Sequence, residues 1–124
     1  MQIGLIEDDV AIREMLHLVL QDEGFAMTAY RTAEECLQAL ASTAQGLSSL
    51  PIDLLIVDWR LPGSVSGIEV IRHIRENLRL ISLPIILTTA ATFNDTEELE
   101  RLHVKLLEKP FDIGDIVEMV KSLV

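Results

Sequence analysis

The feature that most constrains this chain is an alternation of short apolar runs with segments that have the apolar spacing of helices. The runs lie at residues 2–6, 25–30, 53–58, 84–88 and 104–108. The run at 54–57, Leu-Leu-Ile-Val, contains no polar residue and is too short for a lone helix. Such a run is typical of a strand that is buried on both faces of a sheet.

The intervening segments predict amphipathic helices. They lie at residues 10–23, 32–44 and 67–80, in a short stretch after 94–98, and from 112 onward. Ile12, Leu16 and Val19 belong to one apolar stripe of the first helix, and Gly24 is a suitable stop after it. Residues 32–35, Thr-Ala-Glu-Glu, form a capping box for the second helix.

Strands that alternate with helices predict a parallel sheet covered by helices on both faces. We therefore expect an α/β fold, (βα)5, with one domain over residues 1–124. Right-handed crossovers favour the strand order 2-1-3-4-5, as in a flavodoxin-like three-layer sandwich.

The composition excludes several classes of function. The net charge of −10 disfavours direct binding to nucleic acid or to an anionic membrane. No apolar run approaches the roughly 18 residues of a membrane span, and no basic signal-peptide region begins the chain. The single cysteine, Cys36, lies on a core stripe, so we expect an inert buried thiol. These features predict a cytoplasmic protein.

Polar residues stand at the ends of four predicted strands. They are Glu7, Asp8 and Asp9, then Asp58, Thr89 and Lys109. The carboxyl ends of parallel strands share one edge, where open α/β sheets bind ligands. Each residue alone can have a purely structural role, since strand-end acids often cap turns and lysines are common on surfaces. Their joint placement is much harder to explain in that way.

These residue types suit phosphoryl chemistry with a divalent cation. Clustered carboxylates repel one another and attract a hard cation with oxygen ligands, such as Mg2+. A carboxylate is also a nucleophile toward phosphorus, which makes Asp58 a candidate for an aspartyl phosphate. The ammonium group of Lys109 is suited to hold a phosphoryl oxygen.

Four segments together resemble a response-regulator receiver domain, the phosphoacceptor part of two-component signalling. They are 5–9 (Leu-Ile-Glu-Asp-Asp), 55–63 (Leu-Ile-Val-Asp-Trp-Arg-Leu-Pro-Gly), 84–90 (Pro-Ile-Ile-Leu-Thr-Thr-Ala) and 108–111 (Glu-Lys-Pro-Phe). The resemblance extends over the entire chain.

The resemblance implies a role for each strand-end residue. It implies that Asp58 is the phosphoacceptor, that Thr89 is the switch hydroxyl and that Lys109 binds the phosphoryl group. Mg2+ would be held by Glu7, Asp8, Asp58 and the backbone carbonyl of Arg60. The resemblance also implies a cis bond between Lys109 and Pro110.

The resemblance further implies partners and an output. A histidine kinase, a phosphotransfer protein or a small phosphodonor would supply the phosphoryl group. Activity would be limited to self-phosphorylation and self-dephosphorylation at Asp58, so the chain is not expected to be an enzyme. A switch of the face formed by the fourth helix, fifth strand and fifth helix would control the output, and this face could form a homodimer. The chain is either a stand-alone receiver or a part of a longer regulator.

Two departures from the family pattern keep an alternative open. Leu106 stands where the family commonly has an aromatic switch residue, and the segment before Lys109 is short and lacks the usual Gly-Ala. The alternative is a receiver-like interaction module that acts without phosphorylation. A haloacid-dehalogenase-type phosphatase is a weaker rival, because Arg60 stands where a second acid is needed. A flavin carrier is disfavoured by the acids after the first run. His17, His73 and His103 lack partners at metal-ligand spacing.

Overall fold

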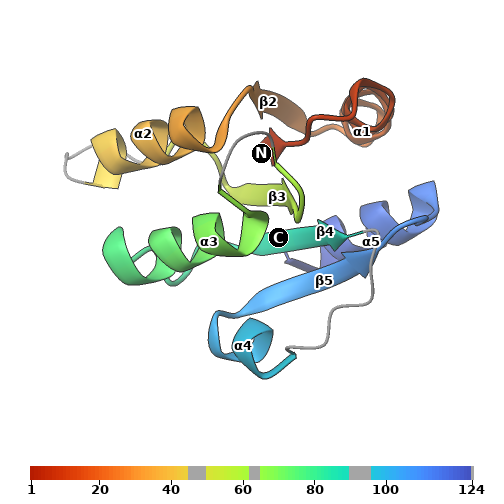
Figure 1. Ribbon diagram of the computed structural model, residues 1–124. Helices are drawn as coiled ribbons and strands as arrows, with labels where there is room; N and C mark the ends of the chain where they lie inside the picture. Colours follow the sequence, from red (N-terminus) through yellow and green to blue (C-terminus); the bar gives the residue numbers. More distant parts are fainter. Residues whose placement is uncertain (45–49, 62–64, 90–95, 124) are drawn as a thin grey trace.

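The computed structural model describes residues 1–44, 50–61, 65–89 and 96–123. Strands and helices alternate along the chain as the sequence predicts (Figure 1). The elements are β1 (Gln2–Ile6), α1 (Val10–Asp22), β2 (Ala26–Tyr30), α2 (Ala33–Ala44), β3 (Leu54–Asp58), α3 (Gly67–Arg72), the π-helix η1 (His73–Asn77), β4 (Ile85–Thr89), α4 (Thr96–Arg101), β5 (Val104–Glu108) and α5 (Ile113–Leu123).

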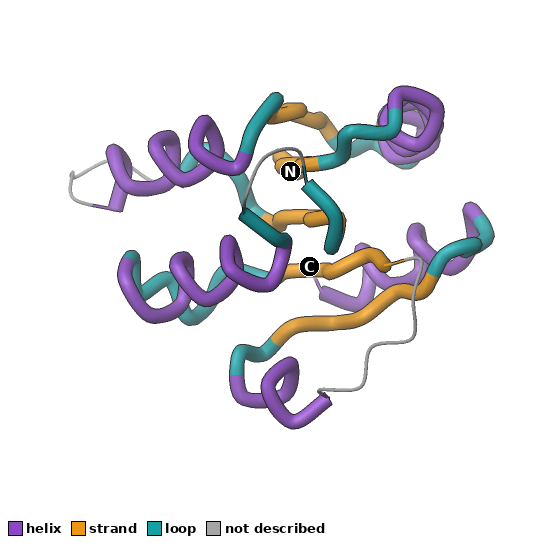
Figure 2. The backbone as a smooth tube through the Cα atoms, in the orientation of Figure 1, coloured by secondary structure: helices purple, strands orange, loops and turns teal. Residues whose placement is uncertain are grey.

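The five strands form one parallel sheet in the order β2-β1-β3-β4-β5 (Figure 2). The central strand β3 pairs with β1 on one side and β4 on the other. Asp58, the last residue of β3, lies opposite Thr88 of β4. The fold and strand order that the sequence predicts are therefore confirmed, and Asp58 lies at the middle of the carboxyl edge.

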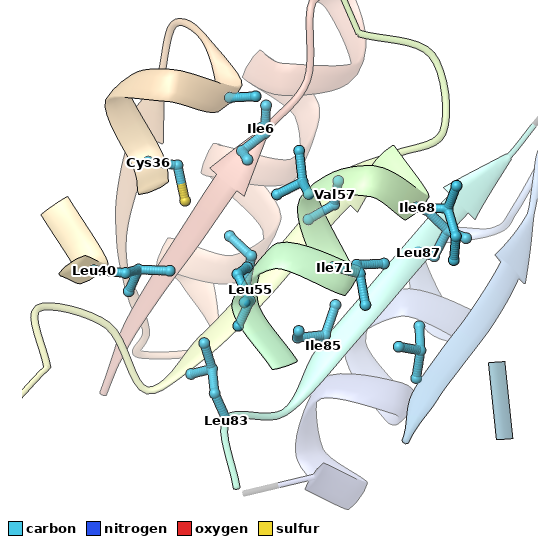
Figure 3. Packing of buried hydrophobic residues seen from close by; sticks show 14 of the residues in the cluster. Ile6, Cys36, Leu40, Leu55, Val57, Ile68, Ile71, Leu83, Ile85 and Leu87 are labelled. Carbon is cyan, nitrogen blue, oxygen red and sulfur yellow. The ribbon is translucent and has the colours of Figure 1, made fainter. Parts of the chain in front are cut away.

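Two separate cores cover the two faces of the sheet. Leu55 and Val57 of β3 belong to the core beneath α2, α3 and α4, whereas Leu54 and Ile56 belong to the core beneath α1 and α5. This alternation follows from the two-residue period of a strand, and it explains why β3 has no polar residue before Asp58. Figure 3 shows Leu55 among the buried side chains of the first core.

Cys36 lies in the first core and is fully buried (Figure 3). Burial raises the pKa of its thiol to about 12, so the reactive thiolate is scarce at neutral pH. The prediction of a buried, inert thiol agrees with this environment.

Two of the predicted helix-end signals are present in the structure. Gly24 has a φ of 92°, and its N–H donates to the Gln21 carbonyl at 3.0 Å, as in a Schellman motif. The Thr32 hydroxyl accepts the Glu35 N–H at 3.1 Å, which confirms that cap. The predicted Pro62-Gly63 turn, the loop at 45–49 and the caps at 94–95 lie outside the described residues.

The helix predicted over residues 67–80 is present, but it is not regular throughout and it ends at Asn77. The α-helix ends at Arg72 and continues as the π-helix η1, which closes with the Leu78 N–H on the His73 carbonyl at 3.0 Å. Arg79 then takes a left-handed φ of 58° and ends the helix. The wider π-turn directs Arg75 into the interior, where it is 7% exposed.

None of the helices in the described part of the chain is long and apolar enough to cross a membrane.

Candidate functional site

Two buried acids meet at the carboxyl edge of the sheet. Asp58 ends β3, and Glu7 follows the neighbouring strand β1, whose Ile6 is paired with Val57. The Asp58 residue is 6% exposed and Glu7 is 4% exposed, whereas Asp8 is exposed. Parallel pairing of β1 with β3 thus brings together acids that are 51 residues apart in the sequence (58 − 7).

Lys109 lies between these two acids. Its Nζ is 3.0 Å from Glu7 Oε1 and 3.2 Å from Asp58 Oδ1. The lysine backbone is fixed because its N–H donates to the Thr89 carbonyl at 2.6 Å. The Lys109–Pro110 peptide bond is cis, as predicted. One ammonium group therefore partly balances two buried carboxylates.

The electrostatics of the site centre on Glu7. Burial raises the pKa of Glu7 to about 7, Asp58 adds to this rise through a hydrogen bond and its charge, and Lys109 offsets part of it. Burial alone would lower the pKa of Lys109. Its hydrogen bond to Glu7 and the charges of Glu7 and Asp58 nevertheless place that pKa above its ordinary value. Below a pH of about 7, Glu7 thus holds a proton that a bound cation would displace.

We expect this raised pKa to make the stability of the protein depend on pH. Between the ordinary pKa of 4.5 and the folded pKa of about 7, the folded protein holds a proton that the unfolded chain releases. The free energy of unfolding should therefore fall by about 3 kcal/mol as the pH rises through this window. Urea unfolding in a chelating buffer, from about pH 5 to about pH 8, measures this slope.

Glu7→Gln should remove this slope and make the protein more stable than wild type at the alkaline end. The matched control is Glu14→Gln, which changes an exposed glutamate on α1. Equal slopes for wild type and Glu7→Gln would contradict the assignment of the proton to Glu7.

The residues present fit a hard divalent cation. Carboxylate oxygens of Glu7, Asp8 and Asp58 all lie within 4.8 Å of one another. An all-oxygen donor set of this charge suits Mg2+. Asp9 has a different task, because its Oδ1 accepts the Ile12 N–H at 3.2 Å and caps α1.

The other predicted site residues lie around this centre. Thr89 ends β4 at the same sheet edge and is 1% exposed. Arg60 is exposed two residues after Asp58, and the role of its carbonyl stays a prediction. Trp59 packs partly buried against the first core, and its N–H donates to the Thr88 carbonyl at 2.7 Å. Leu106 also packs against that core.

Gly67 also belongs to the site, although the sequence marks it only as the start of a helix. A Cβ at this position would lie 2.3 Å from the carbonyl oxygen of Asp58, so no other residue fits without moving the backbone. The Gly67 N–H donates to the Trp59 carbonyl at 2.9 Å. The signal was present as Ser66-x-x-Glu69, a capping box, and the Ser66 hydroxyl does accept the Glu69 N–H.

We expect Gly67→Ala to lower the free energy of unfolding by about 2–3 kcal/mol, because the clash is with backbone atoms. It should also disturb the backbone on both sides of Asp58. The control is Gly114→Ala in α5, where a Cβ would meet no atom within 4 Å. Urea denaturation of both variants checks the difference, and equal stabilities would refute the close approach.

An apolar groove of about 400 Å3 opens beside Lys109. It lies between α1 and the segment after β5 and is lined by Ile12, Met15, Lys109, Pro110 and Phe111. Val10 at the start of α1 and Ile113 at the start of α5 are 53% and 52% exposed. Apolar surface next to a charged site is typical of a place where another protein docks.

Comparisons with known proteins point to one family. Residues 3–121 match the family described as the response regulator receiver domain. The chain is 34% identical over 128 aligned positions to the phosphate regulon transcriptional regulatory protein PhoB of Rhizobium meliloti, covering 98% of this chain and 51% of PhoB. It is 30% identical to the DNA-binding transcriptional regulator NtrC of Escherichia coli, covering 98% of this chain and 24% of NtrC. The chain thus spans about half or less of the length of these relatives.

Solved structures agree with the sequence comparisons. The response regulator TrrA of Thermotoga maritima, in complex with Mg2+ and BeF, is 30% identical with a TM-score of 0.81, and the match covers 99% of this chain and 98% of TrrA. A receiver protein of Pseudomonas putida is 31% identical with a TM-score of 0.77, and the match covers 98% of this chain and 95% of that chain.

Proposed function

The chain belongs to the response regulator receiver domain family, and from this premise we propose that it accepts a phosphoryl group on Asp58 in an Mg2+-dependent phosphorelay. The observation that carries the proposal is the buried Asp58 carboxylate, with Lys109 Nζ at 3.2 Å and the acids Glu7 and Asp8 beside it. The interaction module and the flavin carrier do not require this combination, and the phosphatase would need a second acid where Arg60 stands.

In the proposed reaction an Asp58 carboxylate oxygen attacks the phosphorus of a phosphohistidine. The new O–P bond forms as the donor P–N bond breaks, and the electron pair of that bond returns to the imidazole, which is then protonated. Lys109, which holds Asp58 before the reaction, would hold a phosphoryl oxygen after it. Mg2+, held by Glu7, Asp8, Asp58 and the Arg60 carbonyl, would neutralise charge on the phosphoryl oxygens.

The reverse chemistry belongs to the same site. Water that attacks the phosphorus breaks the O–P bond to Asp58, releases inorganic phosphate and restores the carboxylate. The chain thus acts on its own side chain and turns over no other substrate. We propose that both steps take place in the cytoplasm.

The donor needs access to Asp58, and the apolar groove beside Lys109 supports an approach from that side. We propose that a histidine kinase or phosphotransfer protein docks on this groove, with the exposed Val10 and Ile113, at the starts of α1 and α5, as further apolar contacts. The groove shares Lys109 with the site, so a docked donor would be adjacent to the acceptor.

For the output, we propose a two-state shift of the α4–β5–α5 face. Thr89 ends β4 at the site edge, and Leu106 of β5 packs on the same core as Leu99 of α4. A phosphoryl group that draws the Thr89 hydroxyl toward Asp58 would favour a different position of this face. The changed face would bind a partner or a second copy of the chain.

The single tryptophan offers a test of the proposal. Trp59 adjoins Asp58, so its fluorescence should change on addition of Mg2+ and again on addition of beryllofluoride, which mimics a phosphoryl group. Asp58→Asn should abolish the second change. If wild type gives no beryllofluoride response, the proposal fails. A partner that binds wild type and Asp58→Asn equally would instead support the interaction module that acts without phosphorylation.

A further inference from the structure

Arg75 is a buried cation outside the site described above. It lies in η1, is 7% exposed, and donates hydrogen bonds to three backbone carbonyls. Its Nε is 2.8 Å from the Leu102 oxygen, its Nη2 is 3.2 Å from the His103 oxygen, and its Nη1 donates to the Leu80 oxygen. One side chain therefore ties η1 to the turn before β4 and to the turn between α4 and β5.

Both of these turns contain a strained residue. Arg79 has a φ of 58° and His103 a φ of 56°, a left-handed conformation that favours glycine. Each residue follows a helix, where glycine commonly occupies this position. The carbonyls of Leu80 and His103, which Arg75 holds, belong to these same two turns. Arg75 thus stabilises the end of α4 in the absence of a glycine.

Two ion pairs join the same elements. Arg72 of α3 pairs with Glu98 of α4, and Arg101 of α4 pairs with Glu76 of η1 at 3.4 Å. Together with the Arg75 hydrogen bonds, they form what we call the α3–α4 clasp. Hydrogen bonds to a buried charge are stronger than neutral ones, so Arg75 is its principal member.

The other end of α3 lies against the phosphoacceptor. Gly67 begins α3, binds the Trp59 carbonyl and leaves no room for a Cβ beside the Asp58 carbonyl. The continuous helix α3–η1 therefore runs from the backbone of Asp58 to the residues that hold α4 (Figure 1). A packed helix of this kind moves as a unit, so a displacement of its Gly67 end would also displace its Arg75 end.

From these contacts we propose that the α3–α4 clasp holds α4 in its unphosphorylated position and couples that position to Asp58. Arg75 is the positioning residue of this device, and the inference rests on the proposed function. It offers a route from Asp58 to α4 that needs no aromatic ring at position 106. If the clasp favours the unphosphorylated state, loosening it must strengthen binding of a phosphoryl mimic, since the two equilibria are linked.

The test measures beryllofluoride affinity by Trp59 fluorescence in saturating Mg2+. Arg75→Met and Glu98→Gln should each bind beryllofluoride about fivefold more tightly than wild type. This factor corresponds to a partial shift of the α4 population away from its unphosphorylated position. Glu98→Gln removes a surface ion pair and keeps the test valid if Arg75→Met does not fold. The control is Glu23→Gln, which breaks the Lys121–Glu23 pair between α5 and the end of α1 and should leave the affinity unchanged. Affinities equal to or below wild type in both clasp variants would overturn the proposal.

Amide hydrogen exchange separates a failure of the clasp from a failure of the proposed function. Without any phosphoryl mimic, Arg75→Met should speed exchange at residues 97–102 while α1 is unaffected. Adding His103→Gly should restore part of the protection, because glycine accepts the left-handed φ without support. If wild type ignores beryllofluoride, the proposed function fails, and unchanged exchange in α4 then overturns the clasp independently.

Discussion

Asp58→Asn is expected to abolish covalent phosphorylation of the protein. After incubation with acetyl phosphate and Mg2+, intact-mass spectrometry should detect a phosphorylated fraction of wild type and none of the variant. The reason is chemical, because the amide that replaces the carboxylate is a poor nucleophile and offers no negative charge to a cation. The fold should survive, since Asn has nearly the same shape in a site that is 6% exposed.

The control for this experiment lies at the other end of the same strand. Asp53 immediately precedes β3, and one of its carboxylate oxygens accepts the Gln2 N–H at 2.8 Å. Asp53→Asn should be phosphorylated like wild type. Phosphorylation that persists in Asp58→Asn and maps to another residue would show that the acceptor is wrongly assigned.

Lys109→Met should give the second large effect, a fall of about 100- to 1000-fold in the rate of phosphorylation by acetyl phosphate. The Lys109 ammonium group lies 3.2 Å from Asp58 Oδ1, and the backbone N–H of Lys109 donates to the Thr89 carbonyl. Both contacts place the ammonium group where it can bind a phosphoryl oxygen. Methionine is also unbranched and is one atom shorter than lysine, so the substitution removes the charged ammonium group and the hydrogen bonds that it donates to Glu7 and Asp58. The time course of the mass shift at fixed Mg2+ measures the rate.

A second lysine of the same strand region provides the control. Lys105 lies in β5, is exposed and does not belong to the site, so Lys105→Met should react at the wild-type rate. Lys109→Met should also be less stable than wild type above pH 7, because Glu7 and Asp58 lose the charge between them. A wild-type rate for Lys109→Met would remove the lysine from the proposed mechanism.

The fold and the centre of the site could be predicted because both depend on local patterns. Apolar runs of strand length predict buried strands. Parallel pairing then brings Glu7, Asp58, Thr89 and Lys109 to one edge of the sheet, whatever the conformation of the loops. The buried state of Asp58 follows equally from its position at the end of an apolar strand. The roles of these residues in catalysis remain predictions for the experiments above.

Arg75 could not be predicted from the sequence. An arginine in a helical segment is usually exposed, and its three acceptors lie 5, 27 and 28 residues further along the chain. The π-turn that directs it inward has no sequence signal of its own. The end of the third helix at Asn77 also has no sequence signal, because an arginine such as Arg79 seldom takes a left-handed φ.

The π-turn in η1 has a consequence for protein engineering. A π-helix carries about one more residue in a turn than an α-helix, so a single insertion or deletion at 73–74 would rotate every later side chain of that helix, including Arg75. Arg75 would then face water and lose the carbonyls that it binds. Chimeras that exchange this helix between receivers should therefore transfer the whole segment from Ser66 to Leu80, together with the matching turn at His103, as one interchangeable part.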